Sequence, residues 1–192
     1  KPHSQNIDKK DLTLLDKWIV SKANLLIKDS TAHYDKFEAD KLLKKIELFI
    51  DDLSNWYIRR NRRRFWKSEN DTDKFVAYQT LYDVLLSLIK LLSPILPFIT
   101  ERMYLNISQD DPHENHDSIH LSSYAKHNDD KIDMDLLKKV ETLKKVIESG
   151  RATRKKANIK VRQPLSDLKI YENDPILTKF ILDQKQLILD EL

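Results

Sequence analysis

A mainly α-helical fold is predicted for this chain from three features of its sequence. The chain contains one glycine in 192 residues, so few positions can adopt the positive φ angles of tight hairpin turns. Apolar residues recur at the spacing of amphipathic helices through most of the chain. Charged residues make up 34% and apolar residues 40% of the composition, which is typical of a folded soluble chain. At this length the chain can bury a core, as one large domain or two small ones.

The first two helices are expected to run from the start of the apolar periodicity to a cluster of arginines. The first is expected over about residues 12–33, with Asp11 as its N-terminal cap. The second is expected to be long, from near Phe37 to the arginines within 59–64. The expected core of the bundle consists of Trp18, Phe49, Leu53, Trp56, Leu85 and Ile89.

A third helix is expected after a polar break, with Asp71 or Thr72 as its cap. It is apolar nearly all round, which is typical of a helix at the centre of a bundle. Pro94 and Pro97 are expected to end it, and a fourth helix should follow over about 98–106.

The remainder is predicted to be a polar loop, one helix and a small mixed unit. Residues 107–130 show no helical period, which returns over about 132–157. A strand is expected at Asp167–Tyr171 and a last helix from about Pro175. The predicted fold is therefore mainly α: a linker at 1–10, a helical bundle at 11–125, and at 126–192 a helix with a small α+β unit, which is expected to be truncated.

Composition also limits the partners. The net charge is only +3, so an argument for nucleic-acid binding must rest on where the cations lie. The absence of cysteine excludes disulfides and thiolate metal sites. No apolar run is expected to span a membrane, because the best candidate, 84–99, is interrupted by Lys90, Pro94 and Pro97. The start has no signal peptide and no initiator methionine, so we expect a soluble piece of a longer protein in the cytoplasm.

The most informative stretch is 51–66, which places five arginines among large aromatic side chains at the end of the second helix. Arginine suits phosphate and base recognition because its planar fork donates parallel hydrogen bonds and its face stacks. Interleaved aromatics are typical of proteins that read unpaired RNA bases. On a helix, Arg60 and Arg64 would continue the buried stripe, whereas Arg59, Arg62 and Arg63 would project outward. Trp56 and Tyr57 are expected in the core.

Three weaker patterns accompany this run. A basic segment, 151–162, offers a second cationic surface or simply a solvated helix end that complements the helix dipole. His113, His116 and His120 have spacing that zinc ligands can adopt, but the sequence supplies no cysteine and no evident fourth ligand. The adjacent Asp51 and Asp52 lack a nucleophile or metal ligands nearby. No Gly-rich phosphate loop or dinucleotide pattern is present. We therefore predict no catalytic residue and no metal site in this chain.

Several motifs together resemble the anticodon-binding domain of class I isoleucyl-tRNA synthetases. They are Leu15-Asp16-Lys17-Trp18-Ile19-Val20-Ser21, the run from Asp51 to Trp66, Leu92-Ser93-Pro94-Ile95-Leu96-Pro97-Phe98-Ile99-Thr100-Glu101, Ser118-Ile119-His120-Leu121, and Gly150-Arg151 with Lys160-Val161-Arg162-Gln163-Pro164-Leu165. Their order and spacing resemble the family from about residue 12 to the end. The proline-containing motif is shared with the valyl and leucyl enzymes, and the arginine triplet points to isoleucine.

The resemblance implies that the whole enzyme ligates isoleucine to tRNA(Ile) with ATP and Mg²⁺, through an aminoacyl-adenylate. The HIGH and KMSKS signatures of the family's catalytic domain are not in this sequence, so this chain is expected to recognise RNA without catalysis. The expected partners are the anticodon stem-loop and the catalytic domain of the same polypeptide, with no membrane and no cofactor in this chain. The residues expected to bind tRNA are Arg59, Arg62, Arg63, Trp66, Lys155, Lys156, Lys160 and Arg162.

Three other interpretations remain open at this point. The chain could be the same domain of a valyl- or leucyl-tRNA synthetase. It could be a helical protein-interaction module whose basic surface meets an acidic partner, which predicts exposed apolar anchors beside the arginines. It could also be a free-standing RNA chaperone, although the linker-like start favours part of a larger protein.

Overall fold

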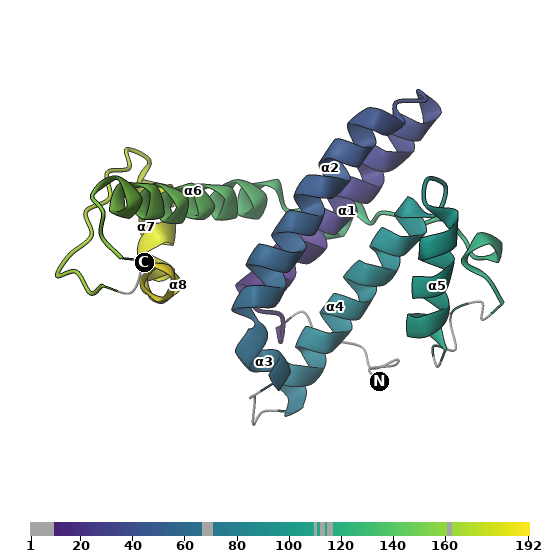
Figure 1. Cartoon of the computed structure of the whole chain (residues 1–192), viewed down its shortest axis with the longest axis horizontal. Helices are drawn as coiled ribbons and strands as arrows, with labels where there is room; N and C mark the ends of the chain where they lie inside the picture. The colour runs from purple at the N-terminus through teal and green to yellow at the C-terminus, as the bar shows by residue number, and fades with distance from the viewer. Residues whose placement is uncertain (1–9, 67–70, 110, 112–113, 115–116, 161–162) are drawn as a thin grey trace. The chain divides into compact units, whose positions relative to one another are not determined.

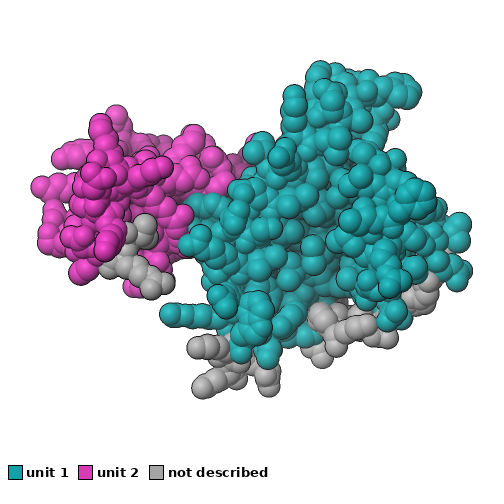
Figure 2. Space-filling view, viewed as in Figure 1, with its two compact units in different colours: residues 1–133 teal, residues 134–192 magenta. Residues whose placement is uncertain are grey.

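The computed structural model describes residues 10–66, 71–109, 111, 114, 117–160 and 163–192. The predicted linker at 1–10 lies almost wholly outside the described residues. Contacts divide the chain into two units, Lys1–Asp133 and Met134–Leu192, which Figure 2 colours separately. The predicted domain division at 125/126 stays a prediction.

The described parts of the chain are mainly helical, as predicted. The helices are α1 (Leu14–Asp35), α2 (Ala39–Asp51), η1 (Asp52–Ile58), α3 (Arg62–Trp66), α4 (Asp71–Leu92), α5 (Pro97–Ser108), η2 (Ile119–Leu121), η3 (Asp129–Lys131), α6 (Met134–Lys156), α7 (Pro175–Asp183) and α8 (Lys185–Glu191).

Helix α1 begins with a reciprocal capping box. The Asp16 amide donates to Thr13 Oγ1 at 3.3 Å, and the Thr13 amide donates to Asp16 Oδ2 at 2.9 Å. The two bonds satisfy amides that the first helical turn leaves without partners. The expected cap at Asp11 is therefore wrong, because the helix begins at Leu14 and Thr13 occupies the cap position.

Helices α1 and α2 form an antiparallel hairpin (Figure 1). The turn is a Schellman motif, in which the Glu38 amide donates to the His33 carbonyl and the Phe37 amide to the Tyr34 carbonyl. This motif requires a left-handed residue, and that residue is Phe37, with φ of 55°. Its side chain is 95% exposed, so no packing in the core offsets the unfavourable free energy of this backbone conformation.

The second helix is not the uninterrupted α-helix that the sequence predicts. Regular α2 gives way at Asp52 to a π-helical segment, η1, in which the Arg59 amide donates to the Ser54 carbonyl five residues earlier. The short helix α3 follows. Such π segments are rare and usually mark an inserted residue in a helix. Within η1, the side chains of Leu53, Trp56 and Tyr57 are buried, as predicted.

Helix α4 is the central helix of the first unit and contacts α1, α3 and α5 (Figure 1). By length and composition alone, the helical segment Thr72–Leu92 is apolar enough to cross a membrane. The sequence was expected to contain no such segment. However, 44% of that window is buried inside the structure, and a core helix of a soluble protein passes the same test. Ile89 is buried as expected, whereas Leu85 is only half-buried and Val84 takes the fully buried position.

Helix α5 closes the bundle beside α4 and is held by a small core of its own. Tyr104, Ile89 and Ile119 are buried together. The Tyr104 hydroxyl donates to Glu114 Oε2 at 3.0 Å, and the same carboxylate pairs with Lys90 Nζ at 2.6 Å. Pro97 stands in the first turn of α5, where proline is well accommodated.

The second unit, Met134–Leu192, consists of α6 packed with α7, followed by α8. Helix α6 ends in another Schellman motif, with Asn158 at φ 55° and the Ile159 amide donating to the Arg154 carbonyl. The predicted strand at Asp167–Tyr171 is not formed among the described residues, and the α+β character of this unit is therefore not confirmed. A strand needs a hydrogen-bonded neighbour, and Leu168, Ile170 and Tyr171 remain exposed instead.

Candidate nucleic-acid interface

Helix α3 and the end of η1 present an exposed basic and aromatic surface, which we call the arginine surface: Arg59, Arg62, Arg63 and Trp66. All four side chains are exposed, as the helical period predicts for the three arginines. Trp66 is 68% exposed, which is unusual for so large an apolar ring. The Arg62 guanidinium carbon lies 5.7 Å from the centre of the Trp66 ring, within the range of a cation–π contact. The surface therefore combines charge with an accessible aromatic face.

Phe65 anchors α3 from the inner side. Its ring is buried and makes edge-to-face contacts with Tyr78 at 5.2 Å, Trp66 at 6.2 Å and Tyr57 at 6.4 Å between ring centres. Edge-to-face pairs at these distances are favourable beyond the burial of area. Trp66 thus rests with one side on an ordered aromatic cluster while the rest of its surface remains accessible.

Arg60 belongs to the helix packing, as the helical period predicts. Its guanidinium carbon lies 3.3 Å from the centre of the buried Trp56 ring, and its Nη1 donates to the Asn55 carbonyl at 3.1 Å. Stacking of a guanidinium on an aromatic face stabilises both groups. Arg60 therefore supports the π-helical segment.

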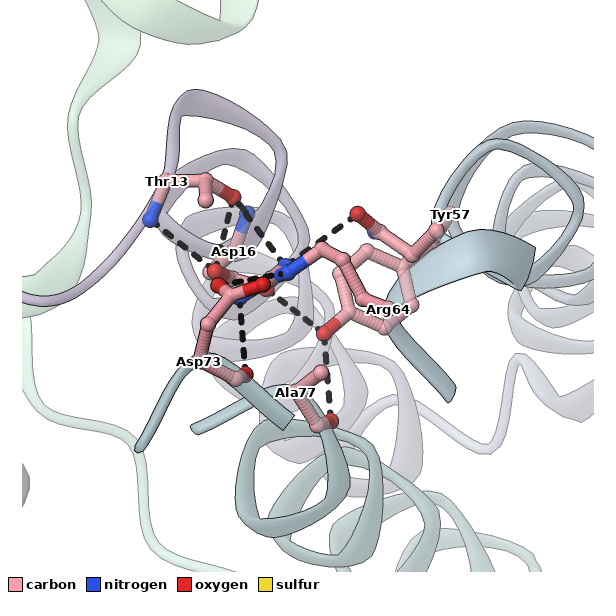
Figure 3. Close-up of polar contacts among 7 residues, drawn as sticks. Thr13, Asp16, Tyr57, Arg64, Asp73 and Ala77 are labelled. Carbon is pink, nitrogen blue, oxygen red and sulfur yellow. Dashed lines mark hydrogen bonds and ion pairs between the residues drawn. The ribbon is translucent and has the colours of Figure 1, made fainter. Parts of the chain in front are cut away.

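Arg64 joins three helices through a buried polar network (Figure 3). Its Nη1 donates to Asp16 Oδ1 at 2.9 Å, and its Nε donates to Asp73 Oδ1 at 2.8 Å. The Nη1 atom also lies 3.1 Å from Asn61 Oδ1. Asp16 is fully buried and receives a further bond of 2.7 Å from the Tyr57 hydroxyl. The planar guanidinium thus spans carboxylates in the first turns of α1 and α4, where the helix dipoles favour negative charge.

These contacts fix the charge states of the network. Burial disfavours the ionised form of Asp16, but hydrogen bonds from Arg64, Thr13 and Tyr57 outweigh it and hold the pKa of that carboxyl below its ordinary value. Burial opposes the charge on Arg64 as well, but its bonds to Asp16 and Asp73 raise the pKa of the guanidinium. Burial, together with the charge of Asp16, raises the pKa of Tyr57, so its hydroxyl remains a donor.

The basic segment of the second unit divides into structural and exposed cations. Arg154 is buried, and its Nη1 donates to the carbonyls of Lys160 at 3.2 Å and Gln163 at 2.9 Å. Arg151 pairs with Glu191. Lys155, Lys156 and Lys160 are exposed and present their charges to solvent. Arg162, which the sequence also suggests as an RNA contact, lies outside the described residues.

The adjacent aspartates make structural contacts, and the described histidine of the other pattern, His120, is exposed. Asp52 is buried and pairs with Lys22, and Asp51 accepts a bond of 2.6 Å from the Asn55 side chain. His113 and His116 lie outside the described residues. Within the described parts of the chain, no three His, Asp or Glu side chains are placed to hold a metal ion.

Sequence reasoning did not identify the Asp16–Arg64–Asp73 network or the anchoring role of Phe65. One signal was present, since Thr13 and Asp16 have the spacing of a capping box. The pairing of Asp16 with Arg64, 48 residues away, carries no local signal.

The fold and this surface together define a class of protein: a helical bundle that presents arginines and an aromatic ring suited to RNA. The family described as "Anticodon-binding domain of tRNA ligase" matches residues 16–171. Because this match covers most of the chain, the chain belongs to that family.

Curated relatives agree with the family. The isoleucine–tRNA ligase of Dehalococcoides mccartyi (strain CBDB1) is 39% identical over 178 residues, or 93% of this chain and 18% of the relative. That of Treponema denticola is 37% identical over all of this chain and 18% of its own length. That of Clostridium tetani is 43% identical over 81% of this chain and 15% of its own length. The chain thus spans less than a fifth of the length of these relatives.

Proposed function

We propose that this chain is the anticodon-recognition region of an isoleucine–tRNA ligase and that it binds the anticodon stem-loop of tRNA(Ile). The observation that carries the proposal is the exposed Trp66 beside Arg62, Arg63 and Arg59 on a bundle of the anticodon-binding family. The names of the relatives support isoleucine rather than valine or leucine.

The chemistry of the arginine surface suits an RNA loop. An unpaired anticodon base stacks on the accessible face of Trp66, and stacking of this kind is worth roughly 1–3 kcal/mol per base. The Arg62 guanidinium beside that ring donates to a base edge or to the adjoining phosphate. Arg59 and Arg63 hold the backbone of the loop, and Lys155, Lys156, Lys160 and Arg162 hold the backbone of the RNA elsewhere.

The remaining activity belongs to the longer polypeptide. We assign aminoacylation of tRNA(Ile), with ATP and Mg²⁺, to the catalytic domain of that polypeptide, in the cytoplasm, and assign no catalytic step to this chain. An exposed apolar face on α5 supports a protein contact with that domain. It consists of Phe98, Ile99 and Met103, with Leu96 just before the helix. Exposed apolar side chains gathered on one element are typical of protein–protein contacts.

The experiment that tests the proposal is a binding titration at several salt concentrations. The chain is compared on a tRNA(Ile) transcript, the same transcript with a substituted anticodon, and a tRNA(Val) transcript. We expect tRNA(Ile) to bind tightest, with a log–log salt slope of about 0.7 per phosphate neutralised on single-stranded RNA. Equal affinity for all three would contradict anticodon reading. Absence of RNA binding by the folded chain would favour the protein-interaction module instead.

A further inference from the structure

The orientation of the short helix α3 depends on its attachments to the rest of the bundle. It has five residues, Arg62–Trp66, and isolated helices shorter than about 12 residues are marginal in water. Its backbone continues from η1 through hydrogen bonds from the Asn61 amide to the Tyr57 carbonyl and from the Phe65 amide to the Asn61 carbonyl, and side chains fasten it to longer helices. Two inward-facing side chains do so, since Phe65 is buried among aromatic rings and the Arg64 side chain is only 13% exposed.

Arg64 and Trp66 lie on opposite sides of α3. With about 100° between successive residues of a helix, Trp66 falls between Arg62 and Arg63, and Arg64 points away from it. Any rotation of α3 about its axis therefore swings Trp66 and Arg62 in the direction opposite to Arg64. The side chain that best resists this rotation is the one fixed at two separate points.

Arg64 is fixed in this way. Asp16 receives Nη1, whereas Asp73 receives Nε at 2.8 Å and Nη2 at 2.7 Å. One carboxylate belongs to the first turn of α1 and the other to the first turn of α4, and both helices are parts of the bundle core (Figure 3). A lysine has a single ammonium group on a flexible stem, so it reaches one of these carboxylates but cannot hold both in a fixed plane.

We propose that Arg64 is a positioning residue for RNA: by bridging Asp16 and Asp73 it fixes the rotation of α3 and so sets the direction in which Trp66 and Arg62 meet an unpaired base. The inference rests on the proposed function and adds to it a residue that touches no RNA. It predicts that the orientation of Trp66 depends on a guanidinium on the far side of the helix.

The first test needs no RNA. The chain contains three tryptophans, of which Trp18 and Trp56 are buried and Trp66 is exposed. Each gives its own indole N–H signal by NMR, and the signal that disappears in Trp66→Phe belongs to Trp66. We expect Arg64→Lys to lower the heteronuclear NOE of the Trp66 indole and leave that of Trp18 unchanged. The matched control is Lys90→Met, which removes another half-buried ion pair of the same unit, with Glu114. An unchanged Trp66 signal in Arg64→Lys would overturn the inference.

The second test is a double-mutant cycle on tRNA(Ile) affinity. We expect Trp66→Ala to weaken binding by about 5- to 150-fold, the range for loss of one stacking aromatic, and Arg64→Lys to weaken it by at least about fivefold, because a misdirected Trp66 loses part of the same stacking. In a chain that already carries Arg62→Gln and Trp66→Ala, Arg64→Lys should change the affinity by less than about twofold.

The outcomes separate the inference from the proposed function. A loss from Arg64→Lys that persists in full in the Arg62→Gln, Trp66→Ala background would show that Arg64 acts by another route, and would overturn the positioning role alone. If the double variant Arg62→Gln, Trp66→Ala bound RNA as tightly as the unchanged chain, the arginine surface would not be the RNA site, and the proposed function would be overturned. Unfolding curves measured for each variant ensure that all affinities refer to folded protein.

Discussion

Arg64 Nη1 lies 2.9 Å from Oδ1 of the fully buried Asp16, and this bond ties the end of the arginine run to the first turn of α1. The same carboxyl group closes the capping box with Thr13 and accepts the Tyr57 hydroxyl. One side chain therefore starts a helix, satisfies a buried phenol and neutralises an arginine. Removing it should disturb all three at once.

We expect Asp16→Asn to lower the free energy of unfolding by about 1.5–3 kcal/mol, because it removes the charged acceptor that Arg64, Thr13 and Tyr57 share, while Asp73 still pairs with the guanidinium. Urea denaturation measures the change. The control is Asp29→Asn on the same helix, which removes the more exposed pair with Lys45 and should cost less than about 1 kcal/mol. Equal losses in the two variants would show that the buried network contributes no more than a surface pair.

Acidification should destabilise the chain through the same carboxyl group. Its pKa in the folded state lies below the ordinary value of 3.8, so the stabilisation is fully present above that pH and is lost as the pH falls through the folded value. We expect the free energy of unfolding to decline below about pH 4, and to decline less steeply in Asp16→Asn. Parallel declines in the two proteins would assign acid sensitivity to other carboxylates.

Phe37→Gly should stabilise the α1–α2 hairpin. Phe37 holds a left-handed backbone conformation with φ of 55° and a side chain that is 95% exposed. Glycine adopts this conformation without steric penalty, and about 1 kcal/mol of strain is relieved. Thermal unfolding measures the gain. Phe37→Ala retains a Cβ and should give no such increase, and a gain of the same size in both variants would contradict the backbone explanation.

Arg63→Gln should weaken RNA binding in a way that depends on salt. If Arg63 contacts one phosphate, its loss lowers the log–log salt slope by about 0.7 and affects transcripts of different sequence alike. The matched control is Lys44→Gln, an exposed cation on α2 outside the arginine surface. An unchanged slope in Arg63→Gln, or an equal change in Lys44→Gln, would show that Arg63 is not a specific phosphate contact.

Much of the fold could be predicted because its helices carry apolar stripes. The periodicity predicted α1, α4, α5 and α6 to within a few residues, and it correctly placed Arg59, Arg62 and Arg63 outward and Arg64 inward. The partners of Arg64 could not be predicted, since Asp16 and Asp73 are near it only after α1 and α4 pack together. Whether the exposed arginines bind tRNA stays a prediction.

Two local errors have physical causes. Leu168 and Ile170 alternate with polar residues as in a strand, but alternation cannot supply the neighbouring strand that hydrogen bonding requires, and these residues remain exposed and without regular secondary structure. The change from α2 to η1 was also missed. The wide turn of η1 takes up one extra residue, so the apolar stripe stays on the buried face, and buried Trp56 and Tyr57 are compatible with either geometry.

The π-helical segment gives the arginine surface tolerance to a change in residue number. If one residue, such as the exposed Ser54, were deleted from η1, the wide turn could close to a regular α-helical turn, and the residues beyond it would keep their direction because the wide turn already absorbs one extra residue. Arg64 would then still reach its carboxylates and Trp66 would still face outward. A single-codon deletion in this segment would therefore shorten the chain without redirecting the surface.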